Sequence, residues 1–190
     1  MAYYSKEKLA AMGFKRLGEN VKISDKASIY NCDQIEIGNN SRIDDFCVVS
    51  GAVNIGAFCH ITPMCLIAGG LPGITFDDFS TLAYGVKVFA QSDDYSGESM
   101  ANSLVPREYK NEIFKAVTIG RHVIVGAGAI IFPGVHVAVG CSVGSMALLN
   151  KSTQPWGVYV GNPARRIKER KKNLLELERK FLEEIKNDSF

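Results

Sequence analysis

The feature that most constrains this chain is an apolar residue that recurs at every sixth position along three runs. A period of six is neither the helical period nor the alternation of a simple β-strand. It is typical of a hexapeptide β-helix, in which each six residues form one short parallel strand and one corner. The repeated positions are Ile37, Ile43, Val49, Ile55, Ile61 and Ile67, then Phe76, Leu82 and Val88, and finally Ile119, Val125, Ile131, Val137, Val143 and Leu149.

A second slot, four positions after each repeated residue, is mostly filled by small residues, which let successive coils approach closely. Cysteines occupy this slot at Cys47, Cys59, Cys65 and Cys141. In such places cysteine behaves as a small apolar residue. We therefore expect buried thiols, with neither a disulfide framework nor a metal site.

The repeat is interrupted twice. Equivalent residues such as Ile37 and Ile55 lie eighteen apart, which gives three hexapeptides per coil, but the step from Ile55 to Phe76 is longer and predicts a bulge within residues 69–73. A larger break follows Val88, where the register would force charged residues and a proline into the core. Residues 93–115 are therefore predicted to leave the coil as an extended loop, and long loops on regular scaffolds are often functional.

Three segments follow from this pattern. Residues 1–18 are predicted to form a short helical cap that closes the open end of the coil. Residues 19–163 form the β-helix with its loop. Residues 164–190 are predicted to form a C-terminal helix, starting near Ala164, whose apolar stripe packs on the coil or on a neighbouring subunit.

Bulk properties exclude several classes of protein. The net charge is only +2, although residues 165–190 hold nine Lys/Arg and six Asp/Glu. The basic patch is short and has no interleaved aromatic residues, so nucleic-acid binding is disfavoured. No apolar run reaches the length of a membrane span, and the first residues lack the apolar core of a signal peptide. We expect a cytoplasmic protein without a membrane span.

The chain contains three histidines that could act as a general base near neutral pH. His60 and His136 each precede an inward residue, so both should point outward from a strand, and His122 should lie at a corner. A solvated surface role is the alternative for each. His60 is the strongest candidate, because it lies in the coils before the long loop, where the loop could fold back over it.

Polar residues at the start of the loop favour a polyhydroxylated or amino-bearing ligand. Asp93, Asp94 and Glu98 are carboxylates that can accept hydrogen bonds from sugar hydroxyls or an ammonium group, and Tyr95 adds a phenol. The alternative is that these residues simply make turns. Thr62, which follows His60 closely, is a further candidate for substrate binding.

Basic residues after the last coils could hold phosphate groups. Lys151 lies near a chain turn, and Arg165 and Lys168 follow a second turn at residues 161–163. The chain lacks the glycine-rich loops that usually bind nucleotides.

Two segments resemble the hexapeptide-repeat acyltransferases. Residues 117–135 (VTIGRHVIVGAGAIIFPGV) resemble the segment that follows their active-site loop, and residues 159–167 (YVGNPARRI) resemble their C-terminal signature. The loop SDDYSGE at 92–98 and the turn PWG at 155–157 are similar to sugar acetyltransferases of bacterial surface-polysaccharide pathways, including lipopolysaccharide biosynthesis. The chain is also similar to the galactoside and maltose acetyltransferases.

This resemblance implies a mainly β fold, a left-handed parallel β-helix, that assembles as a homotrimer with acetyl-CoA between neighbouring coils. The coenzyme contacts that it implies are Ala127, Ser145, Asn150, Lys151, Arg165 and Lys168. Separately, the spacing of the loop carboxylates is not that of a calcium site, so no metal is expected.

One departure from the family concerns the base. Galactoside acetyltransferases have a catalytic histidine where this chain has Asp93, and His60 falls where those enzymes contact the acceptor sugar. We therefore predict that His60 is the base, assisted by Asp93 or Asp94. The backbone N–H near Ala127 is the predicted donor to the thioester oxyanion.

The preferred function is acetyl transfer from acetyl-CoA to a sugar hydroxyl. A first alternative is N-acetylation of an amino sugar carried on a nucleotide, since an amine delivered neutral needs little help from a base. A second is a non-catalytic β-helix scaffold or carbohydrate-binding subunit.

Overall fold

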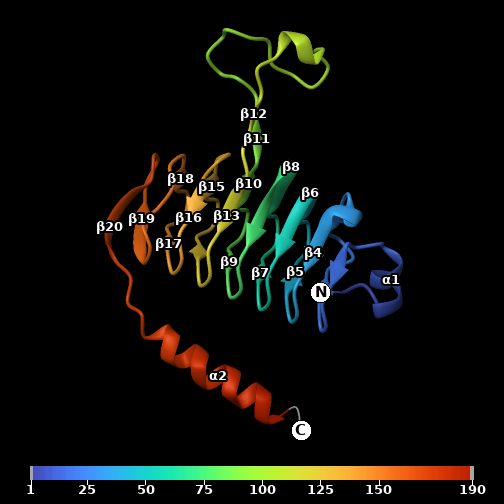
Figure 1. Ribbon diagram of the computed structural model, residues 1–190, viewed down its shortest axis with the longest axis vertical. Coiled ribbons are helices and arrows are strands. Elements are labelled where there is room, and N and C mark those ends of the chain that lie inside the picture. Colours follow the sequence, from blue (N-terminus) through green and yellow to red (C-terminus); the bar gives the residue numbers. More distant parts are fainter. Residues whose placement is uncertain (1, 189–190) are drawn as a thin grey trace.

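The computed structural model describes residues 2–188, which form a parallel β-solenoid whose coils stack along one axis (Figure 1). Each coil contributes short strands to three faces. The first face contains β1 (Arg16–Leu17), β4 (Ile35–Ile37), the end of β6 (Val48–Ile55), the end of β8 (Leu66–Phe76), β13 (Val117–Ile119) and β16 (His136–Val137). The second face contains β2 (Lys22–Ile23), β5 (Arg42–Ile43), β7 (His60–Ile61), β9 (Thr81–Leu82), β14 (Ile124–Val125), β17 (Ser142–Val143) and β19 (Gly157–Val160). The third face contains β3 (Ser28–Ile29), the starts of β6 and β8, β10 (Lys87–Phe89), β15 (Ile130–Ile131) and β18 (Leu148–Leu149).

The repeated apolar residues form one continuous core along the axis. Every repeated position is buried, with at most 2% of the residue exposed. The four cysteines of the second slot are also buried and free. The parallel hexapeptide architecture predicted from the sequence is therefore confirmed, because each coil buries its inward residues against the coils above and below it.

Both predicted interruptions occur. The pairing of β6 with β8 shifts its register near Gly51, and the inserted residues leave Leu71 86% exposed. The larger excursion leaves the coil through a two-stranded antiparallel neck, β11 (Gln91–Ser92) and β12 (Ile113–Phe114), and contains a 3-10 turn, η2 (Arg107–Tyr109). It projects well beyond the stack (Figure 1).

The N-terminal end is closed by α1 (Lys6–Ala11), which Ser5 caps by accepting a hydrogen bond from the Lys8 N–H. Leu9 is 4% exposed and seals the core. Strand pairing begins already at β1, inside the segment predicted as a cap, and a second short turn, η1 (Cys32–Gln34), precedes β4.

The C-terminal segment differs from the prediction of a helix from Ala164. Arg165–Glu169 form strand β20, antiparallel to β19, and helix α2 begins only at Leu174 and ends at Asp188. The physical reason is that β19, the strand of the last coil, would otherwise expose unpaired backbone N–H and C=O groups. β20 pairs with these groups. Helix α2 then runs back along the stack (Figure 1), and the Phe181 ring lies against Phe58 and Phe79, which confirms packing on the coil.

The three faces meet at corners, which we name for use below. The helix corner carries α2 and includes residues 38–41, 56–59, 77–80 and 120–123. The His60 corner begins at the end of the second face and includes residues 42–47, 60–65, 83–86, 126–129 and 144–147. The loop corner follows the third face, carries the excursion, and includes residues 68–73, 89–92, 113–116, 132–134 and 150–152.

Candidate active site

A cavity of about 340 Å³ lies at the base of the loop, on the loop corner. Its walls come from three successive coils and from both ends of the excursion. The lining residues are Ala68, Phe89, Gln91, Ser92, Asp93, Tyr95, Glu112, Phe132 and Pro133. Of the residues predicted to bind substrate or to assist the base, Asp93 and Tyr95 line this cavity.

The two adjacent aspartates of the loop have different surroundings. Asp94 accepts hydrogen bonds from the Ser96 N–H and from the Ser96 and Ser99 hydroxyls, each at 2.8 Å. The backbone bond from Ser96, followed by the two hydroxyls, lowers the pKa of Asp94 below its ordinary value. The Asp93 carboxylate has no hydrogen-bond or ion-pair partner among residues 2–188. Asp94 therefore shapes the loop, whereas Asp93 presents a free carboxylate to the cavity.

A second carboxylate in the cavity is already neutralised. Glu112 pairs with Lys110, whose Nζ lies 3.2 Å from Oε2 and whose side chain is only 8% exposed. Sequence reasoning did not predict this pair, because the hexapeptide register shows only that residues 93–115 cannot enter the core. Glu98, predicted to bind substrate, is exposed and does not line the cavity.

His60 points outward from β7 as predicted, and it belongs to an ion-pair network. Its Nε2 lies 2.9 Å from Asp44 Oδ2, and Asp44 also pairs with the Arg42 guanidinium. The Asp44 carboxylate is 3% exposed, while the His60 side chain is 38% exposed. Sequence reasoning missed Asp44 and Arg42. The eighteen-residue period of the coil could have predicted this contact. Arg42 lies eighteen residues before His60, so the two residues are neighbours on the adjacent strands β5 and β7.

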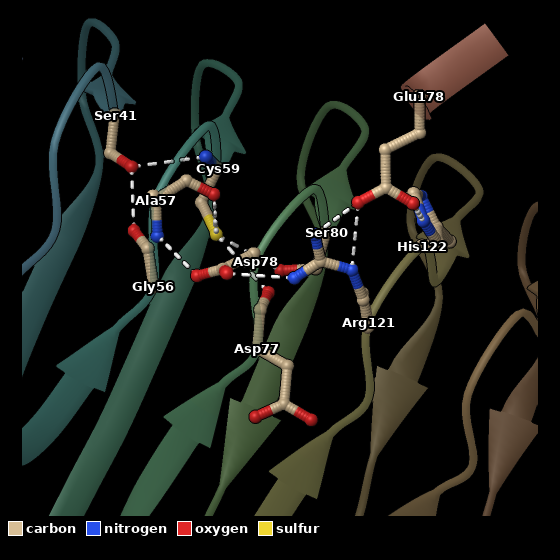
Figure 2. A network of polar contacts seen from close by, with 10 residues as sticks. All are labelled: Ser41, Gly56, Ala57, Cys59, Asp77, Asp78, Ser80, Arg121, His122 and Glu178. Atoms are coloured by element: carbon tan, nitrogen blue, oxygen red, sulfur yellow. Dashed lines mark hydrogen bonds and ion pairs between the residues drawn. The ribbon is translucent and has the colours of Figure 1, made fainter. Parts of the chain in front are cut away.

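The other two histidines lie elsewhere. His122 is 8% exposed and pairs with Glu178 of α2, which also pairs with Arg121 (Figure 2). His136 is exposed on the first face and shares a short hydrogen bond with Thr118. Both positions are remote from the His60 corner in the fold, because they belong to the helix corner and to another face.

Thr62 lies at the His60 corner, 8% exposed. Its Oγ1 is buried and has no geometric hydrogen-bond partner among the residues that the structure describes. The Cys65 thiol is close enough to interact with this hydroxyl: the pKa of Cys65 is lowered chiefly by the Cys47 thiol and further by Thr62, so Thr62 is turned toward the packing of the corner.

One chain does not bring all the predicted site residues together. His60 and Thr62 lie on one edge of the third face, and Asp93 and Tyr95 lie on the opposite edge. The predicted coenzyme contacts divide in the same way. Ala127 and Ser145 lie at the His60 corner, Asn150 and Lys151 at the loop corner, and Arg165 and Lys168 on β20.

The chemistry of these two edges suits an activated acyl group with phosphates. The backbone N–H groups of Ala127 and Ser145 donate to no other residue in the described part of the chain. Lys151, Arg165 and Lys168 are exposed, and none of them forms an ion pair within residues 2–188.

The described residues contain no cluster of side chains suited to a metal ion, and no described helix is long and apolar enough to cross a membrane.

Comparison with known proteins places these features in a family. No family model matches the chain. A dTDP-4-amino-4,6-dideoxy-D-glucose acyltransferase of Escherichia coli is 45% identical over 184 residues, which cover 95% of each protein. The N-acyltransferase AntD of Bacillus cereus, in complex with dTDP and 3-hydroxybutyryl-CoA, has 44% identity and a TM-score of 0.96, covering 98% of this chain and all of AntD.

A variant of AntD was solved with dTDP-4-amino-4,6-dideoxyglucose and coenzyme A, and it superposes with a TM-score of 0.95 at 45% identity, covering 96% of this chain and 98% of AntD. These relatives span the coil, the loop and the C-terminal segment together. The similarity to acyltransferases found in the sequence is thus confirmed, and AntD was solved with coenzyme A or 3-hydroxybutyryl-CoA bound. The chain belongs to the hexapeptide-repeat acyltransferases.

Proposed function

We propose that this protein transfers an acyl group from acyl-CoA to the amino group of a dTDP-linked 4-amino-4,6-dideoxy sugar. The observation that carries this proposal is the unpaired Asp93 carboxylate in the loop cavity, in a chain 45% identical to an enzyme named for that substrate. A carboxylate can hold an ammonium group through charge-assisted hydrogen bonds. The comparisons thus favour the amino-sugar alternative over a hydroxyl acceptor, and membership of an acyltransferase family argues against a non-catalytic scaffold.

The acceptor would sit at the base of the loop. Asp93 holds the sugar amine, and Phe89 and Phe132 supply apolar walls against which a sugar ring or a base can lie. Tyr95 is 90% exposed in one chain, so it is free to close over a bound ligand. This arrangement orients the amine toward the third face, where the donor would lie.

The donor would run along the third face toward the end of the stack. Lys151, Arg165 and Lys168 supply unpaired positive charge for the phosphates of coenzyme A. The free N–H of Ala127 or Ser145 is a donor for the oxyanion that forms as the amine attacks the thioester. Asn150 lies beside Lys151 and can hydrogen-bond the pantetheine chain.

We further propose that the active site forms between copies of this chain in a homotrimer. The predicted residues occupy opposite edges of one face, so neighbouring copies with parallel axes would bring the His60 corner of one against the loop corner of the next. The outward residues of this face support such contact, since Val48, Leu66, Ile130 and Leu148 are apolar and half-buried. Acyl-CoA is a cytoplasmic metabolite, and we place the enzyme there, in surface-polysaccharide biosynthesis.

The direct test is an assay of coenzyme A release with matched acceptors. We expect turnover with dTDP-4-amino-4,6-dideoxyglucose, using acetyl-CoA and 3-hydroxybutyryl-CoA in parallel. The control acceptor is the dTDP-6-deoxy sugar with a hydroxyl at the same carbon, which should react far more slowly. Equal rates with the two acceptors would contradict a preference for the amine and favour O-acylation. If no sugar nucleotide causes release of coenzyme A, the proposed substrate class is refuted.

A further inference from the structure

The His60 corner contains a preassembled trio of one guanidinium, one carboxylate and one imidazole. Asp44 Oδ2 accepts from Arg42 Nη2 at 3.0 Å and lies 2.9 Å from His60 Nε2. The carboxylate is 3% exposed, so these two residues replace the water that would otherwise solvate it. The Asp44 carboxylate in turn raises the pKa of Arg42 above its ordinary value, which keeps the guanidinium charged.

This geometry determines which nitrogen of His60 carries the proton. A carboxylate only accepts hydrogen bonds, so a neutral His60 must hold its proton on Nε2. Its Nδ1 then carries a free lone pair, and that atom has no partner among residues 2–188. Since 38% of the side chain is exposed, Nδ1 can be reached from outside.

The chain also contains a closed version of the same trio. At the helix corner, Glu178 bonds both Arg121 and His122 (Figure 2). The His122 ring also stacks on Phe79. His122 is only 8% exposed and is tied to a residue of α2, so this trio serves to hold the helix. The trio at His60 has the same composition, but no described helix covers His60, whose side chain is 38% exposed, and Thr62 lies at the same corner.

We propose that Asp44, clamped by Arg42, is a positioning residue that fixes His60 in the Nε2–H tautomer, so that Nδ1 takes up the proton released by the acceptor during acyl transfer. The proposal rests on the proposed function. As the amine nitrogen attacks the thioester carbonyl, the new C–N bond forms and the C–S bond breaks. The proton leaves the nitrogen for Nδ1 and passes to the departing thiolate, so coenzyme A leaves as the thiol and His60 returns to its neutral form.

The tautomer can be measured independently of activity. Nitrogen-15 NMR of the histidine-labelled, full-length protein should show His60 protonated at Nε2 at a pH where the ring is neutral. Replacing Asp44 by Asn supplies an amide that can donate as well as accept, so Asp44→Asn should lose this preference. An Nδ1–H tautomer in the unaltered protein would overturn the inference at once.

The kinetic test compares the same chemical change in the open and the closed trio. A neutral amine attacks without a base, but its nitrogen must lose a proton once the C–N bond forms, and His60 serves that step. Asp44→Asn should therefore lower kcat by up to the roughly 10²–10⁴-fold that a correctly placed base contributes, with little change in KM for acyl-CoA. Glu178→Gln, which makes the equivalent change in the closed trio, should leave turnover nearly unaltered. Equal losses in both variants would mean that Asp44 is merely structural.

Two further outcomes keep the result decisive. If Asp44→Asn does not fold, Arg42→Lys keeps both charges but loses the paired guanidinium contacts, and it should lower kcat about tenfold; unchanged turnover in that variant would refute the positioning role. If the unaltered enzyme acylates no amino sugar, the proposed function fails, and the tautomer of His60 still decides whether Asp44 orients the ring.

Discussion

At the scale of single residues, Asp93 and Asp94 are neighbours with different surroundings, and they should respond differently to the same substitution. Asp93→Asn removes the free negative charge in the cavity. We expect kcat/KM for the amino sugar to fall roughly 10–100-fold, the cost of a lost hydrogen bond to a charged group. KM for acyl-CoA should not change. Initial rates with each substrate varied in turn will measure both constants.

Asp94→Asn is the matched control for that experiment. Its carboxylate already accepts bonds from Ser96 and Ser99, so the variant should loosen the loop and increase proteolysis there. A loss of amino-sugar affinity that is larger in Asp94→Asn than in Asp93→Asn would reverse the two roles.

Sequence reasoning identified some site residues and missed others for a definite reason. Asp93 and Tyr95 could be predicted as site residues from their side-chain chemistry, and His60 from its phase in the repeat, because both are visible along the chain. Asp44 and Arg42 were missed because their role depends on stacking between coils, which places residues eighteen apart in contact. The pairing of Lys110 with Glu112 depends on how an irregular loop folds, and no period describes a loop.

At the scale of elements, the coil was predictable and its closing segments were not. Apolar residues at every sixth position determine the parallel strands, whereas the segment after Pro163 carries basic residues that fit either a helix or a strand. The unpaired outer strand of the last coil decides in favour of β20. Helix α2 then reaches back to coils that lie far earlier in the sequence, a long-range contact that local patterns do not encode.

Glu178 should be the main polar anchor of α2. Its carboxylate is 14% exposed and bonds Arg121 and His122. Burial opposes its ionisation, but the hydrogen bonds from Arg121 and His122 outweigh that effect and lower the pKa of Glu178. Glu178→Gln should reduce the free energy of unfolding by about 1–3 kcal/mol at pH 7, the range for an unsatisfied buried partner.

The pH dependence of this loss has a definite sign. Because the folded-state pKa of Glu178 is lowered, its contribution is complete above the unfolded value of about 4.3 and disappears as the pH falls through the folded value. Urea unfolding of both proteins between pH 7 and about pH 3 should therefore show a difference that is constant down to about pH 4.3 and narrows at lower pH. Glu176→Gln, on the exposed side of the same helix, should change stability little. A difference that widens toward acidic pH would contradict this account.

At the scale of the whole molecule, the division of the site between two edges predicts complementation between chains. His60→Ala and Asp93→Asn each damage one edge, and each variant alone should keep at most about a tenth of the activity on the amino sugar. When the two variants are unfolded together and refolded as mixed oligomers, about a quarter of the interfaces should regain both intact edges, as random assembly of a cyclic oligomer requires. Activity should return to about that fraction of the unaltered enzyme. If each site lay within one chain, no activity would return.

The control is the unaltered chain refolded with an equal amount of the double variant. If the sites form between chains, about a quarter of them should again be intact, whereas if they form within chains, about half should be intact. Light scattering that finds a stable monomer would exclude the shared site altogether.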